Sequence, residues 1–179
     1  PIFNLRTDKT VRVPSDLAGV KLRMPPGPGF TAIAKALGAT SVSMPATEMY
    51  MALKTGAIDA QDNPTNMTRD WKLEEVTQQI ILTQHLVQPT FIAIAKPFFD
   101  RLTADQQATI RAAAKSAAEA QIVGSRQDEL DALEAFRKGG KLRIVEPDVA
   151  AFRTAVQAEY KARSEEHTSE LQSHSDLVC

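Results

Sequence analysis

Two polar side chains, Arg23 and Asn63, have the chemistry and the placement to hold an anionic ligand. Arg23 lies in the apolar alternation of residues 20–24 and Asn63 immediately precedes Pro64, so each is expected where a short strand gives way to a proline-stiffened loop. A guanidinium offers a two-pronged donor that matches both oxygens of a carboxylate. If the two strands are parallel in one sheet, both side chains emerge at the same edge, where open α/β sheets place their ligands.

Taken singly, these and other polar residues have plainer interpretations. An arginine in a strand is usually a surface residue, and an asparagine before proline is usually a turn residue. We expect His85 to be a hydrogen-bonded structural residue, and Asp59 and Asp62 to have surface or capping roles on either side of a strand end. Joint placement is what raises Arg23 and Asn63 above this background.

The elements that must position this pair follow from periodicity and from glycine stops. Val20, Leu22 and Met24 alternate with polar residues, as in a strand, and Gly38 and Gly56 each end an amphipathic helix. Two successive strand, helix, strand units of this length predict a parallel sheet with right-handed crossovers. The expected elements are a strand at 20–24, a helix at 30–37, a strand at 39–44, a helix at 48–54 capped by Thr47, and a strand at 57–61.

The second half of the chain alternates short apolar runs with long helical patterns. Thr103 and Gln106 form a capping box that opens an alanine-rich helix reaching to about Lys138. The other expected elements are helical residues from 65 to 76, strands at 80–83, 89–95 and 142–145, and a last helix with Val149, Phe152, Val156 and Tyr160 on one face.

Composition bounds the function classes. The 179 residues carry a formal net charge of −1, 43% hydrophobic residues and a mean hydropathy of −0.23, which indicates a globular protein without a membrane-spanning segment. No cluster of basic and aromatic residues points to nucleic acid. The single cysteine, Cys179, excludes a disulfide framework or a CxxC metal site, so we expect no metal and no cofactor.

Residues 163–179 differ from everything before them. The run loses the apolar period and takes on small polar and acidic residues, which would suit a disordered tail. Arg-Ser-Glu-Glu-His-Thr-Ser-Glu-Leu-Gln-Ser from Arg163, with Leu-Val-Cys at the end, also resembles the translation of a common short-read sequencing adapter. We therefore expect 163–179 to be a non-native tail, and we exclude it from functional reasoning.

The remaining chain resembles the DctP-type solute-binding proteins of TRAP transporters over residues 9–160. The ordered set of segments is specific, whereas any one piece would be weak. The resemblance rests on Lys21-Leu22-Arg23-Met24-Pro25, Lys35-Ala36-Leu37-Gly38-Ala39, Met44-Pro45, Glu48-Met49-Tyr50, Ala52-Leu53-Lys54-Thr55-Gly56, Asp59 with Gln61-Asp62-Asn63-Pro64, Leu82-Thr83-Gln84-His85, and the region 98–110.

This resemblance implies roles for individual residues. Arg23 would pair with the substrate carboxylate and Asn63 would support it, with Gln61 and Ala46 as further substrate-binding positions. The chain departs from the family at two places: Ala46 stands where an aromatic residue is common, which bears on pocket size and ligand identity. Asp62 replaces a usual glutamate, and the shorter side chain shifts a supporting hydrogen bond.

The resemblance also implies an α/β, periplasmic-binding-protein-like fold of two lobes, with parallel-rich sheets, flanking helices and one long connecting helix. Residues 1–88 would form most of the second lobe, 89–128 part of the first lobe and the start of the long helix, and 129–162 a return to the second. The fold would be incomplete, because the sequence does not contain the beginning of the first lobe or a signal peptide. The implied location is the periplasm, and the implied partners are a small carboxylate ligand and the membrane permease subunits.

Three hypotheses therefore remain from the sequence. The first is a fragment of a periplasmic protein that captures an organic acid for a permease. The second is an α/β enzyme acting on a carboxylate substrate, with Arg23 as an anchor and its catalytic residues in the missing N-terminal part. The third is a fragment that exposes a sheet edge and has no stable activity of its own.

Overall fold

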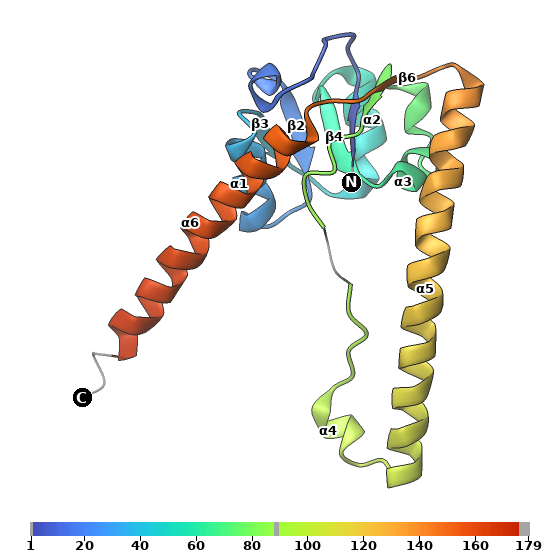
Figure 1. Ribbon diagram of the computed structural model, residues 1–179, viewed down its shortest axis with the longest axis vertical. Helices are drawn as coiled ribbons and strands as arrows, with labels where there is room; N and C mark the ends of the chain where they lie inside the picture. The colour runs from blue at the N-terminus through green and yellow to red at the C-terminus, as the bar shows by residue number, and fades with distance from the viewer. Residues whose placement is uncertain (1, 88–89, 176–179) are drawn as a thin grey trace.

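The computed structural model describes residues 2–87 and 90–175, and a mixed sheet forms the centre of this part of the chain (Figure 1). Within these residues the sheet has six strands in the order β3-β2-β4-β1-β5-β6. The pairs β2–β3, β2–β4 and β5–β6 are parallel, whereas β1 runs antiparallel to both of its neighbours. The strand bounds are β1 Ile2–Leu5, β2 Lys21–Met24, β3 Thr40–Ser43, β4 Ala60–Asn63, β5 Gln79–Ile81 and β6 Arg143–Val145.

The parallel unit predicted from the sequence is confirmed, with two corrections. Strand β4 begins and ends later than expected, so Asp62 and Asn63 lie within it rather than in the following loop. Strand β1 was not predicted, yet it occupies the position between β4 and β5. The sheet is therefore mixed rather than purely parallel.

Helices join and cover the strands. The bounds are η1 Pro14–Leu17, α1 Pro28–Ala36, η2 Ala46–Glu48, α2 Met49–Thr55, α3 Thr65–Asp70, η3 Leu73–Glu75, α4 Lys96–Phe99, α5 Ala104–Gly139 and α6 Val149–Ser175. The expected Thr47 cap is wrong, because a 3-10 turn precedes α2 and shifts its N-cap to Glu48, which makes no capping side-chain hydrogen bond. Gly56 ends α2 as expected, at a φ of 78° that favours glycine.

Apolar residues fill both faces of the sheet. On one face Leu22, Met24 and Phe3 pack with Ile33 of α1 and Phe152 of α6. On the other face the second cluster consists of Met49, Ala52, Leu53, Ile58 and Leu73, and the third of Ile2, Ile80 and Leu142 with Phe136 of α5 packed against it. The helix face predicted for α6 holds at Phe152 and Val156, whereas Tyr160 is exposed.

Helix α5 and the chain leading to it extend far from the sheet (Figure 1). The predicted capping box is present: Gln106 N donates to Thr103 Oγ1, and Thr103 N donates to Gln106 Oε1. The strand expected at 89–95 is wrong for residues 90–95, because the described residues offer no strand beside it, and Phe91 is 85% exposed. Position 89 lies outside the described residues.

The last helix and the hydropathy of all the helices bear on two of the expectations from the sequence. Helix α6 continues to Ser175, into the stretch expected to be non-native, and that expectation stays a prediction. Throughout residues 2–87 and 90–175, none of the helices combines the length and the apolar character required to span a bilayer.

Candidate functional site

Arg23 lies near the carboxyl end of β2, with its backbone paired to Val42 on β3 and Gln61 on β4. The residue is only 3% exposed, and burial lowers the pKa of its guanidinium, an effect that the Asp62 carboxylate opposes. Arg23 Nε and Nη2 both donate to the carbonyl oxygen of Met44, at 3.1 and 2.9 Å. This shared carbonyl fixes the plane of the guanidinium, and Nη1 has no hydrogen bond within the described residues.

Asn63 and Gln61 lie on the same face of the sheet as Arg23. Arg23 is opposite Gln61 in the register, and Asn63 is two residues farther along β4, so all three side chains project to one side. Asn63 Nδ2 donates to Gln61 Oε1, which keeps the two amides in contact. The structure thus brings the predicted residues to adjacent parallel strands, without a direct contact between Arg23 and Asn63.

A buried chain of hydrogen bonds continues from these amides into the sheet. Gln61 Nε2 donates to Asn4 Oδ1 on β1, and Thr68 Oγ1 of α3 donates to the same oxygen at 2.6 Å. Gln61, Asn4 and Thr68 are fully buried. Asn4 Oδ1 thus has two donors, whereas Asn4 Nδ2 is buried without a partner within the described residues. Through Gln61, this oxygen supports the Asn63 amide. Sequence reasoning missed Asn4, because β1 was not predicted.

Ala46, the fourth predicted binding residue, lies to the side of this arrangement. It belongs to η2 and lines a hollow of about 310 Å³ together with Met49, Trp71 and other residues. Met49 also accepts a hydrogen bond from Asn63, with 3.7 Å between Nδ2 and Sδ. Met49 therefore lies between the hollow and the amides of Asn63 and Gln61. Ala46 lines the hollow beside Met49 and is joined to Asn63 only through that residue.

Asp62 and His85 form a buried pair on the opposite face of the sheet. Asp62 Oδ1 lies 3.6 Å from His85 Nε2, and neither atom has a hydrogen bond within the described residues. His85 Nδ1 is 2.8 Å from Thr83 Oγ1, and the imidazole stacks on Phe3 with ring centroids 4.6 Å apart. Burial raises the pKa of Asp62 to about 6 and lowers the pKa of His85 to about 3.

These contacts separate the two predictions. His85 is hydrogen-bonded and packed in the interior, which confirms the structural role expected for it. The surface or capping role expected for Asp62 is wrong, because β4 extends through Asn63 and carries Asp62 into the interior. The residue types of Ala60-Gln61-Asp62-Asn63 show no apolar alternation, so the sequence pattern contained no signal for the burial of Asp62.

Metal binding has no support in the part of the chain that the structure describes. Within residues 2–87 and 90–175, no group of three or more His, Cys, Asp or Glu side chains is arranged to hold a metal ion. What the geometry does offer is a fixed guanidinium on the strand beside the supported amide of Asn63. Its Nη1, which has no hydrogen bond within the described residues, is a donor that suits a carboxylate.

Known proteins resemble this chain in sequence and in structure. The model of bacterial extracellular solute-binding protein, family 7 (DctP), matches residues 3–167. The 2,3-diketo-L-gulonate-binding periplasmic protein YiaO of Escherichia coli is 32% identical over 146 residues, which are 82% of this chain and 44% of that protein. The sialic acid-binding periplasmic protein SiaP of Vibrio cholerae is 30% identical over 146 residues, which are 82% of this chain and 45% of that protein.

A solved structure supports the fold directly. A TRAP periplasmic solute binding protein from Roseobacter denitrificans, with bound 3-deoxy-D-manno-oct-2-ulosonic acid, matches with a TM-score of 0.83 at 42% identity. The match covers 90% of this chain and 53% of that chain. The predicted α/β periplasmic-binding-protein-like fold is thereby confirmed, and the chain spans about half the length of the relatives it matches.

Proposed function

Because the chain belongs to family 7 of the bacterial extracellular solute-binding proteins, the DctP family, we propose that it supplies one side of a carboxylate-binding site in a TRAP transporter. Members of this family are substrate-binding proteins of transporters. The observation that carries the proposal is the buried Arg23, whose guanidinium is fixed by Met44 O while Nη1 has no hydrogen bond within the described residues.

In the proposed site Arg23 neutralises the ligand carboxylate and Asn63 fixes its orientation. Asn63 Nδ2 is already engaged by Gln61, which leaves its side-chain oxygen to accept a hydroxyl or amide hydrogen of the ligand. An ion pair formed away from water is stronger than one at the surface, so closure of the protein over the ligand would increase the affinity. Gln61 acts through Asn63, and Ala46 shapes the neighbouring hollow.

The ligand class that we propose is a small organic acid, including the sugar acids. Two similar proteins are named for binding such compounds, 2,3-diketo-L-gulonate and sialic acid, and a third contains bound 3-deoxy-D-manno-oct-2-ulosonic acid. The whole protein would work in the periplasm, deliver the acid to membrane permease subunits and perform no catalysis.

Titration of the full-length protein with a panel of organic acids tests the proposal. We expect Arg23→Ala to weaken binding of the preferred acid by more than about 100-fold, because it removes a buried partner of a charged ligand. Arg23→Lys should retain part of the affinity, since an ammonium keeps the charge without the fork. The exposed Arg12→Ala variant is the matched control and should bind like the wild type.

Two results would overturn this assignment. Unchanged affinity of Arg23→Ala for every carboxylate would remove the role proposed for the guanidinium. Conversion of a bound acid to product by the wild-type protein would instead favour the alternative of an enzyme that uses Arg23 as its anchor.

A further inference from the structure

The exposed stretch of helix α5 ends at Asp128, which contacts helix α3. Residues 115–127 are all exposed, whereas Asp128 is partly buried and Ala132, one turn later, is 1% exposed. Phe136, another turn on, packs against the cluster of Ile2, Ile80 and Leu142. The stripe of Asp128, Ala132 and Phe136 is therefore where the long helix is anchored, and Asp128 lies at the end of the anchor from which the free part of the helix departs.

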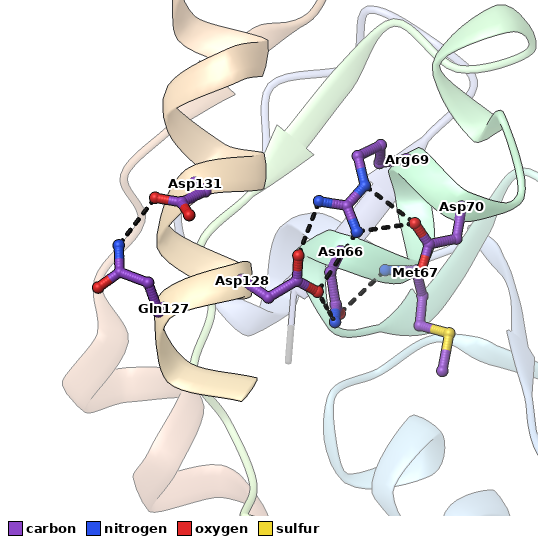
Figure 2. A network of polar contacts seen from close by, with 7 residues as sticks. All are labelled: Asn66, Met67, Arg69, Asp70, Gln127, Asp128 and Asp131. Carbon is purple, nitrogen blue, oxygen red and sulfur yellow. Dashed lines mark hydrogen bonds and ion pairs between the residues drawn. The ribbon is translucent and has the colours of Figure 1, made fainter. Parts of the chain in front are cut away.

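Two residues of α3, Asn66 and Arg69, donate hydrogen bonds to the Asp128 carboxylate (Figure 2). Arg69 Nη1 donates to Asp128 Oδ1 at 2.9 Å and Arg69 Nη2 to Oδ2 at 3.3 Å, while Asn66 Nδ2 donates to Oδ2 at 2.8 Å. Asp70 holds Arg69 from the other side, with 2.8 Å between Nη2 and Oδ1. The hydrogen bonds from Arg69 and Asn66 hold the pKa of Asp128 below its usual range.

The opposite side of α3 is joined to the proposed ligand site. Helix α3 starts two residues after Asn63, and the buried Thr68 donates to Asn4 Oδ1, which also accepts from Gln61. Gln61 in turn accepts from Asn63. One short helix therefore connects the supported amide of the site to the anchor of α5.

We propose that Asp128 is a positioning residue for ligand binding. The hydrogen bonds that Asn66 and Arg69 donate to its carboxylate set the angle between α5 and β4, the strand that carries Asn63. The angle matters because α5 extends far from the sheet, so a small rotation at Asp128 moves its distant end by a large distance (Figure 1). Whatever part of the protein that end carries is thereby placed relative to Arg23 and Asn63. This inference rests on the proposed function, in which the protein closes over its ligand.

Distances between spin labels test the position of the helix directly. Cysteines introduced at Ser116 on α5 and at Lys54 on α2, both exposed in the wild type, carry the labels in a full-length protein that has no other cysteine. We expect one narrow distance distribution for the wild type. The distribution should be broader for Asp128→Asn, because this variant loses the negative charge that Arg69 binds. Ligand dissociation should become about two- to fivefold faster, the scale of a partly exposed ion-pair network.

Asp131→Asn is the matched control. It makes the same change on the same helix, but Asp131 accepts a hydrogen bond from Gln127 within α5, as Figure 2 shows, rather than from α3. The control should leave both the distances and the dissociation rate unchanged. The exchanged pair, Arg69→Asp with Asp128→Arg, should restore the narrow distribution, which a simple loss of helix stability would not allow.

The outcomes separate this inference from the proposed function. Wild-type distances and rates in both Asp128→Asn and Arg69→Gln would overturn the positioning role, and Arg69→Gln serves alone if the first variant does not fold. If Arg23→Ala abolishes binding while these variants behave like the wild type, the proposed function stands and the inference fails. If the wild type binds no acid, the proposed function fails. The label distances still show whether the contacts of Asp128 with Asn66 and Arg69 fix the position of α5.

Discussion

Replacing Asp62 with asparagine should change how the stability of the protein depends on pH. Asp62 is 5% exposed, and its pKa is raised from 3.8 to about 6 because burial disfavours the carboxylate. The folded state therefore binds a proton in a range where the unfolded state has lost it. The stabilisation from this group is complete below pH 3.8 and is lost as the pH rises through about 6.

The shift corresponds to about 3 kcal/mol of unfolding free energy, at about 1.36 kcal/mol for each pKa unit. We expect the stability of Asp62→Asn, relative to the wild type, to increase by about that amount between pH 4 and pH 7.5. The comparison across pH cancels any constant cost of the new amide. Urea denaturation of the full-length protein without ligand, at intervals of half a pH unit, measures the difference.

His85→Gln provides the opposite test. The pKa of His85 is lowered from 6.5 to about 3 by burial, so the stabilisation from this group is present above pH 6.5 and is lost as the pH falls through about 3. Between pH 4 and 6 the contributions of the two groups to stability have opposing slopes, so they largely cancel each other in the wild type. Stability should rise with pH in Asp62→Asn and fall with pH in His85→Gln. Parallel curves for all three proteins would refute the reasoning.

Smaller changes test how individual elements are held. Thr103→Ala should cost about 1 kcal/mol by removing the cap of α5, measured by thermal unfolding. Phe152→Ala should cost about 3–5 kcal/mol, since this fully buried ring packs α6 against the sheet. Gly56→Ala should lower the free energy of unfolding by about 1 kcal/mol, because φ is 78° and the new Cβ would lie 3.3 Å from Arg6 Nη2. Gly124→Ala, in the exposed part of α5, should raise it by up to about 1 kcal/mol. Thermal unfolding measures both changes.

Local signals predicted the elements whose ends are set by neighbouring residues. Gly38 and Gly56 both have a positive φ: Gly56 follows α2 directly, and Gly38 follows Leu37, the C-cap of α1. Thr103 forms its box with Gln106 three residues away. The alternation in residues 20–24 likewise placed β2. In each case the decisive contacts lie within one turn or along one strand, so the sequence pattern contains them.

Elements that depend on distant partners were predicted poorly. Residues 90–95 are apolar enough for a buried strand, but a strand exists only where a neighbour receives its backbone hydrogen bonds, and the described residues provide none. Strand β1 is the converse case. Its four residues carry no clear alternation, and they form a strand because β4 and β5 lie on either side.

Strand β1 also explains which residues of the proposed site could be predicted from the sequence. Arg23 and Asn63 could be proposed because their side-chain types and their positions near strand ends are local properties. Asn4 faces Gln61 across the β1–β4 pairing and completes the buried amide chain, and Phe3 faces Asp62 in the same register while stacking on His85. A single inserted strand thus contributes Asn4, which supports the proposed ligand-binding residues on one face, and Phe3, which packs on the Asp62–His85 pair on the other. The pH response predicted for Asp62 and the hydrogen-bonded support of Asn63 consequently depend on the same strand, which becomes visible only when the strand order is known.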